Sequence, residues 1–203
     1  MYRFIAMMAV IAIASNMAWA AVDEIAFEAE EADQLQPPMM VVEDKEASGG
    51  KAIVSNVGRQ GWATYEIEIL KANTYYMWGH VIAPDGVSDS FFVTFDEEER
   101  GIDNNNPNIW DVAQGVNWHW DQVDGRGVGI RQFKLDEGVH VLKIWTREEN
   151  TELDAIFMST DMMTQPKLPG EDPKVRDRKA AGRIAVRSRG KLTTLWGELK
   201  RWR

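Results

Sequence analysis

The chain contains no cysteine, which excludes a disulfide framework and a cysteine nucleophile. Its three histidines, His80, His119 and His140, are scattered and match no zinc-ligand spacing. The sequence also lacks a Gly-x-Ser-x-Gly elbow, a His-Glu-x-x-His helix and a phosphate-binding loop. These absences argue against most enzyme classes. A glycosidase, which needs only two suitably placed carboxylates, stays open as the enzymatic alternative.

Only one long hydrophobic run is present, at residues 4–14, and no second one follows it. The run comes after Arg3 and before Ala18-Trp19-Ala20, a small-x-small cleavage site. It is too short to span a membrane and has the layout of a secretory signal peptide. We therefore expect residues 1–20 to be a signal peptide and the protein to be secreted or extracytoplasmic, in the periplasm or at the cell surface. An uncleaved anchor is the alternative.

Charge is divided unevenly along the chain. Residues 21–162 carry 28 acidic and 10 basic side chains, whereas residues 163–203 carry 4 acidic and 12 basic ones. An acidic body disfavours nucleic acid, because phosphate neutralisation needs Lys and Arg. It suits an extracytoplasmic protein that binds calcium or a neutral or cationic partner.

The acidic body has the pattern of short strands. Tyr65, Ile67 and Ile69 alternate with polar residues, and further apolar runs occupy 74–82, 90–95, 132–135, 139–145 and 154–158. Turn residues separate these runs, and Asp136-Glu137-Gly138 predicts a hairpin between the runs 132–135 and 139–145. The pattern predicts an all-β domain over residues 22–162, an antiparallel β-sandwich or jelly roll.

A long polar segment, 97–129, contains Trp110, Trp118 and Trp120. A loop of this length in a compact domain is usually functional. Trp118 and Trp120 are two residues apart, so on an extended segment they face the same way. Their rings could pack against the C–H groups of a sugar. The alternative is that one of these tryptophans fills the core, as we expect for Trp62, Trp78 and Trp145.

Two short motifs bracket the strands, Glu28-Ala29-Glu30 at the beginning and Leu153-Asp154-Ala155-Ile156 at the end. Their order and spacing resemble carbohydrate-binding modules of families 6 and 35, which have a galactose-binding-like β-sandwich. The resemblance covers roughly residues 25–160. It implies that the first and last strands lie side by side and that the domain binds carbohydrate without catalysis.

The resemblance also implies two sites. A structural Ca²⁺ would be held by Glu28, Glu30, the Lys51 carbonyl and Asp154, a mixture of carboxylate and carbonyl oxygens that suits this ion. Solvated strand ends are the alternative. The sugar site would lie in loops at one end of the sandwich, and its residues here would be Trp118, Trp120, Arg147, Asn150 and Glu152. Glu152 stands where the family often has Asn, and no aromatic residue occupies the loop at 43–45.

Residues 163–203 begin with a Pro-rich linker composition and continue as a basic tail. Leu192, Leu195, Trp196 and Leu199 are spaced for a short amphipathic helix whose basic flanks could meet an anionic surface. Disorder is the alternative for this flexible extension. We expect a monomer with a polysaccharide or glycan as its partner. A structural or adhesive sandwich without a sugar site is the competing function.

Overall fold

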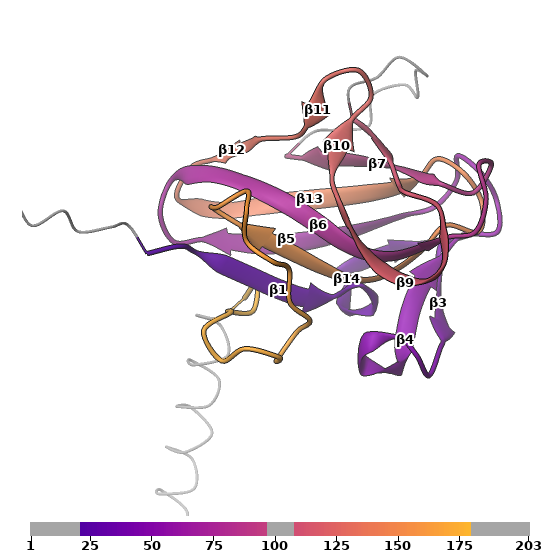
Figure 1. The fold of residues 1–203 in the computed structure, drawn as a ribbon, viewed down its shortest axis with the longest axis horizontal. Coiled ribbons are helices and arrows are strands. Elements are labelled where there is room, and N and C mark those ends of the chain that lie inside the picture. The colour runs from indigo at the N-terminus through magenta and orange to yellow at the C-terminus, as the bar shows by residue number, and fades with distance from the viewer. Residues whose placement is uncertain (1–20, 97–107, 180–203) are drawn as a thin grey trace, which may run out of the picture.

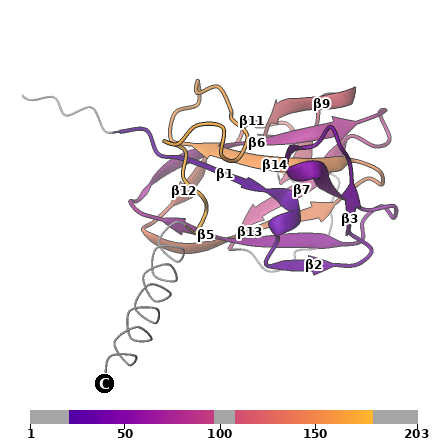
Figure 2. The ribbon, with the colours of Figure 1, turned by 90° about the horizontal axis from the view of Figure 1, so that it is seen from below.

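The computed structural model describes residues 21–96 and 108–179, which form a sandwich of two antiparallel sheets (Figures 1 and 2). In the larger sheet the strand order is β12-β6-β14-β4-β3, with β1 paired to β14 and β9 to β6. Its strands are β1 (Glu24–Glu28), β3 (Met40–Glu43), β4 (Lys51–Val54), β6 (Asn73–Ala83), β9 (Gly115–Gln122), β12 (Phe133–Leu135) and β14 (Glu152–Ser159). The expected all-β antiparallel sandwich is therefore confirmed.

The smaller sheet has the order β2-β5-β13-β7-β8. Its strands are β2 (Gln34–Gln36), β5 (Trp62–Ile69), β7 (Ser90–Phe95), β8 (Ile109–Asp111) and β13 (Gly138–Thr146). A ribbon of β10 (Asp124–Gly125) and β11 (Gly129–Ile130) and two short 3-10 turns, η1 (Ala29–Glu31) and η2 (Ser48–Gly50), complete the described elements.

The core lies between the two sheets and follows the period-two pattern of the sequence. In β5, Tyr65, Ile67 and Ile69 are fully buried while Glu66 is exposed, as the alternation predicts. Trp110 is also fully buried, and a side chain at Gly79 would clash with its ring. Trp110 therefore fills the core, which was one of the two possibilities for the tryptophans of the long segment.

The first and last strands pair as predicted. Phe27 of β1 lies opposite Ile156 of β14, and β14 is paired along its other edge with β6. Beyond the end of β1, β4 takes its place beside β14, with Ile53 opposite Leu153. The junction between β1 and β4 therefore falls at Asp154, where the register with β6 also shifts by a β-bulge.

The hairpin predicted at 136–138 is wrong. β12 pairs with β6 in the larger sheet, whereas β13 pairs with β5 and β7 in the smaller one. The connection therefore crosses from one sheet to the other, and Gly138 accommodates it with a φ of 143°. This crossing lets Phe133 and Leu142 approach the same core from opposite sides.

The segment 97–129 is not one long loop. Its described part, from residue 108 onward, contains β8, β9, β10 and the first residue of β11. β9 is an eight-residue strand that pairs with β6, so Trp118 and Trp120 stand on the edge of a sheet. Residues 97–107 lie outside the described part of the chain.

Ordered contacts with the sandwich continue past residue 162, where composition suggested a linker. Residues 163–179, here called the strap, return along β1. The backbone of Arg176 forms an isolated parallel β-bridge with that of Ile25. Arg176 donates two hydrogen bonds of 2.8 Å to the Asp23 carboxylate. Arg178 is 5% exposed and donates to Asp33 at 2.5 Å. These two ion pairs, together with those of Lys167 with Glu24 and of Lys179 with Asp33, fasten the strap to the N-terminal part of the domain.

The expected signal peptide (1–20), the basic tail beyond Lys179 and its amphipathic helix lie outside the described residues. Within 21–96 and 108–179, no helix is long and apolar enough to cross a membrane.

We predict that Arg178→Ala lowers the free energy of unfolding by about 2–4 kcal/mol. The substitution removes one of the two cationic partners of Asp33, the other being Lys179, and the donor to two backbone carbonyl groups, those of Glu31 and Glu66. Denaturant unfolding measures the loss, with exposed Lys174→Ala of the same strap as the control. Equal stability of the two variants would contradict the role assigned to Arg178.

Candidate functional site

The edge strand β9 presents two tryptophans on one face, as the sequence predicted. Trp120 lies opposite His80 of β6, and Trp118 is two residues before it. The His80 ring lies near both indoles, with its centroid 5.5 Å from that of Trp118 and 5.0 Å from that of Trp120. The interplanar angle with Trp118 is 26°, so these two rings are stacked. The result is a row of three aromatic rings across the sheet edge.

Asp44 contacts Trp118 at the end of this row, and the carboxylate of Glu152 lies near that of Asp44. The Trp118 indole N–H donates a 3.0 Å hydrogen bond to Asp44 Oδ2, from the turn after β3. Burial, together with the negative charge of Asp44, raises the pKa of Glu152 above its ordinary value. Glu152 begins β14 and is half-buried. The structure therefore brings Trp118 and Glu152, both predicted site residues, to the same acidic corner and adds Asp44 and His80.

Arg147 and Asn150 have local roles in the connection from β13 to β14. Arg147 donates to Ser90 Oγ at 2.6 Å and pairs with Glu148, which leaves its side chain 12% exposed. Asn150 has a φ of 62°, and its backbone N–H donates to the Ser55 carbonyl. These hydrogen bonds join the β13–β14 connection to itself and to the adjacent residues Ser90 and Ser55. Contact of Arg147 or Asn150 with a ligand stays a prediction.

The predicted calcium residues gather where β1 gives way to β4. Ser48 in the turn before β4 donates its hydroxyl to Glu28 Oε1 at 2.9 Å and its backbone N–H to Asp154 Oδ2 at 3.0 Å. Glu30 reaches the same turn, because a Cβ at Gly49 would be 3.2 Å from Glu30 Oε1. Lys51 follows the turn directly as the first residue of β4. Three acidic side chains thus surround one short turn.

One oxygen of each of these carboxylates has an unusual environment. Glu28 Oε2, Glu30 Oε2 and Asp154 Oδ1 are buried and have no hydrogen-bond partner within residues 21–96 and 108–179. Burial raises the pKa of Glu28 to about 7 against the hydrogen bond from Ser48, and the charges of Glu30 and Asp154 add to the rise. Burial also raises the pKa of Glu30. Unpaired buried carboxylate oxygens are costly, and a bound cation would remove that cost.

Side chains alone, however, do not form a complete metal-coordination site in the described part of the chain. Within 21–96 and 108–179, no group of three or more His, Asp or Glu side chains is arranged to hold a metal ion. A cation at this turn would therefore need backbone oxygens in addition to the carboxylates. The mixed ligand set predicted from the sequence, with the Lys51 carbonyl, has that composition.

Asp154 joins this turn to the aromatic row. Its Oδ2 accepts from Ser48 and also lies 2.5 Å from His80 Nδ1. Because His80 contacts both Trp118 and Trp120, one buried carboxylate connects the acidic turn with the half-buried rings. His80, Asp44 and Ser48 were not singled out from the sequence. They come from separate segments, and only their positions beside β14 and β9 bring them together.

No protein-family model matches the sequence, and no curated protein matches it significantly. Solved structures do match. A family 35 carbohydrate-binding module from Paenibacillus barcinonensis aligns with a TM-score of 0.53 and 15% identity, over 67% of this chain and 98% of the module. The C-terminal family 6 module of a laminarinase from Zobellia galactanivorans aligns with a TM-score of 0.50 and 14% identity, over 68% of this chain and 99% of the module.

A Podospora anserina β-(1,4)-mannanase that contains a family 35 module aligns with a TM-score of 0.52 and 16% identity, over 72% of this chain. This chain spans only 29% of the mannanase, and the same share of an exo-β-1,3-galactanase from Phanerochaete chrysosporium. The described domain therefore has the β-sandwich fold of family 35 and family 6 carbohydrate-binding modules. The resemblance inferred from the two bracketing motifs is confirmed at the level of the fold.

The raised pKa of Glu28 predicts a pH dependence of stability in chelator-treated protein. Between about pH 4.5 and about pH 7, the folded state holds a proton that the unfolded chain has released. The free energy of unfolding should consequently fall as pH rises through this range. Glu28→Gln should reduce the fall in urea titrations, whereas Glu137→Gln, in an exposed turn, should leave it unchanged. Identical pH profiles for all three proteins would contradict the raised pKa.

Proposed function

We propose that the domain is a non-catalytic carbohydrate-binding module that binds a polysaccharide or glycan along β9. The observation that carries this proposal is the row formed by Trp118, His80 and Trp120, with the carboxylates of Asp44 and Glu152 at one end. Aromatic faces pack against the apolar C–H faces of sugar rings, and carboxylate oxygens accept hydrogen bonds from sugar hydroxyls. The fold shared with known carbohydrate-binding modules supports the same reading.

The arrangement suits recognition of several sugar units rather than tight capture of one. The rings stand on the edge of a sheet and are half-buried, so each presents only part of its surface. We expect weak binding of monosaccharides and a gain in affinity with chain length as successive units contact successive rings. The matched structures include a mannanase and the binding module of a laminarinase, so oligomers of mannose and of glucose form the first screen.

Catalysis by the domain is not part of the proposal. The matched modules from Paenibacillus barcinonensis and Zobellia galactanivorans are named as binding modules, and the matched enzymes are much longer chains. A glycosidase would release sugar, so a hydrolysis assay separates the two functions. A purely structural or adhesive sandwich would bind no glycan.

We also propose that a structural Ca²⁺ is held at the turn before β4 by Glu28, Glu30, Asp154 and the Lys51 carbonyl. The buried, unpartnered oxygens of the three carboxylates fit such an ion, because Ca²⁺ binds carboxylates and carbonyls together. The ion would supply positive charge only. It would allow all three acids to ionise in a buried place and would stabilise the loop connection between β1 and β4.

Export through the N-terminal segment is part of the same proposal, since polysaccharides are met outside the cytoplasm. The expected monomer and the contact of the basic tail with an anionic surface stay predictions.

Replacing Trp118 tests the binding face. We predict that Trp118→Ala weakens the binding of the best oligosaccharide from the screen by about tenfold, because a stacked aromatic contact is lost. Trp118→Phe, which keeps an aromatic face, should lose less. Isothermal titration calorimetry measures both, with exposed Asn117→Ala of the same strand as the control. Unchanged binding by Trp118→Ala would place the sugar elsewhere.

Calcium should stabilise the fold. We predict that Ca²⁺ added to chelator-treated protein raises the melting temperature by several degrees, because an ion that binds only the folded state stabilises it by mass action. Glu30→Gln should diminish this rise, and Glu46→Gln, an exposed glutamate before the same turn, should not. If Ca²⁺ leaves the melting temperature of the parent unchanged, the ion site does not exist.

A further inference from the structure

Trp118 is held on two sides, and both contacts lead to the acidic turn, residues 44–50, which joins β3 to β4. The Trp118 indole N–H donates to Asp44 Oδ2 of that turn at 3.0 Å. The Trp118 ring stacks on the ring of His80, with 5.5 Å between the centroids. His80 is bonded through Nδ1 to Asp154, whose Oδ2 also accepts a backbone N–H of the acidic turn. These contacts form a closed ring that begins and ends at Trp118.

Hydrogen bonds inside the acidic turn join Asp44 to the end of the turn that would hold the ion. The Asp44 N–H donates to the Gly50 carbonyl at 3.0 Å, and the Asp44 carbonyl accepts from the Ala47 N–H at 3.3 Å. Asp44 Oδ1 accepts from the Glu46 N–H at 2.9 Å, so the two carboxylate oxygens have separate partners. Lys51, whose carbonyl is a proposed calcium ligand, follows Gly50 directly. A change in the turn on ion binding would therefore reach Asp44 through hydrogen bonds.

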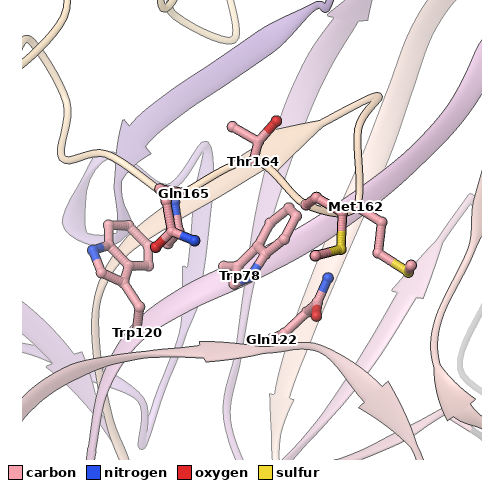
Figure 3. A pocket seen from close by; sticks show the side chains of 8 residues that line it. Trp78, Trp120, Gln122, Met162, Thr164 and Gln165 are labelled. Atoms are coloured by element: carbon pink, nitrogen blue, oxygen red, sulfur yellow. The ribbon is translucent and has the colours of Figure 1, made fainter.

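Trp120 has a further support at the other end of β9. It lines a pocket of about 420 Å³ on the outer face of the larger sheet, and the lining of this neutral pocket includes no charged side chain. Trp78 and Gln122 lie at its floor, and residues 162–166 form its wall. Figure 3 shows the Trp120 indole beside Gln165 of that wall. Trp120 is thus held in part by a segment that is separate from the acidic turn.

We propose that Asp44 and His80 are positioning residues of the binding face, through which Ca²⁺ at the acidic turn and a sugar on β9 strengthen each other's binding. Bound Ca²⁺ would tie three carboxylates and the Lys51 carbonyl to one point and so restrict the turn. Asp44 and His80 would then hold Trp118 in one orientation, and a sugar that stacks on an oriented ring loses less conformational freedom on binding. The inference rests on the proposed function and on the proposed ion.

The ion acts through these side chains and not by contact with the sugar. The carboxylate oxygens that would bind it, Glu28 Oε2, Glu30 Oε2 and Asp154 Oδ1, are buried, and the side chain of Asp154 has no exposed surface. His80 lies between Asp154 and the indoles of β9. The two sites therefore influence each other only if the side chains between them respond to the ion.

The indole N–H signal of Trp118 tests the link without any sugar. Ca²⁺ added to the chelator-treated, ¹⁵N-labelled mature chain should move the Trp118 signal more than that of Trp120. Asp44→Asn should reduce this movement, because it keeps one acceptor oxygen for the Glu46 N–H but replaces the other with an amide group that cannot accept from the indole. Asp85→Asn is the matched control, since the Asp85 side chain and carbonyl also accept N–H groups of an exposed turn.

Calorimetric titration with mannohexaose and laminarihexaose measures the linkage itself. For the probe that binds better, saturating Ca²⁺ should lower the Kd of the parent about fivefold relative to chelator-treated protein. The saturating oligosaccharide should lower the Kd of Ca²⁺ by the same factor, because linkage is reciprocal. Asp44→Asn should bring this ratio closer to one. His80→Phe, which keeps an aromatic ring but not the hydrogen bond to Asp154, should do the same.

The ratio of the two Kd values, rather than the affinity, identifies a positioning role. A residue that only touches the sugar, or only stabilises the fold, would change the Kd with and without Ca²⁺ together and leave the ratio unchanged. The rise in melting temperature with Ca²⁺ should persist in Asp44→Asn and His80→Phe, since neither residue is proposed to bind the ion. Asp85→Asn should keep the ratio of the parent.

The outcomes separate this proposal from the proposed function. If Ca²⁺ raises the melting temperature but changes neither the Trp118 signal nor the Kd of the oligosaccharide, the ion site stands and the linkage falls. If Ca²⁺ does not bind, the linkage also falls, while binding of the oligosaccharide by the chelator-treated protein leaves the proposed function intact. If the Trp118 signal moves in the parent and not in Asp44→Asn but no oligosaccharide binds, the positioning role of Asp44 is supported and the sugar function falls.

Discussion

The candidate sites depend on the hydrogen bonding of one strand, β14. Along one edge it pairs with β6, and along the other it pairs first with β1 and then with β4. Asp154 occupies the point at which β1 gives way to β4, and the β-bulge there re-aims its side chain. The acidic turn, the His80 ring and the edge strand β9 all take their positions from this junction.

One side chain, His80, connects the buried Asp154 with the aromatic rings at the sheet edge. Its ring nitrogen Nδ1 is hydrogen-bonded to Asp154, and its ring contacts the two indoles of β9. The same strand then continues to Gln122 and the neutral pocket. β9 thus carries two environments, an acidic end beside Asp44 and a neutral end beneath residues 162–166.

The strap gives the neutral end its wall and joins the two ends of the described chain. Arg176 and Arg178 reach Asp23 and Asp33, which flank β1 and η1, and Val175 packs on the cluster around Trp78 and Phe157. The matched binding modules cover about two thirds of this chain. Positive side chains that composition assigned to a basic tail are here used to fasten the strap to an acidic body.

The sequence allowed prediction of the features that local pattern encodes. Alternation in Tyr65–Ile69 predicted which residues are buried, and the two bracketing motifs predicted that Phe27 and Ile156 lie side by side. Spacing alone predicted that Trp118 and Trp120 share a face, since successive strand residues point to opposite sides.

The features that the sequence did not predict depend on contacts between distant segments. Turn chemistry at 136–138 indicates a change of direction but not the sheet that the next strand joins, so the predicted hairpin was wrong. His80 and Asp44 carry no motif, and their roles follow from strand pairing. Residues 163–166 fall in the predicted linker, whose composition gave no sign that they wall a pocket.

The indole N–H resonances of the tryptophans report directly on whether a sugar binds along β9. In a ¹H–¹⁵N spectrum of the mature chain titrated with a neutral oligosaccharide, the Trp118 and Trp120 signals should move. The buried Trp110 signal, whose N–H is held by Asp121 at 2.7 Å, should stay in place. Shifts confined to Trp62 and Trp145, on the other sheet, or no shifts with any oligosaccharide would contradict the account.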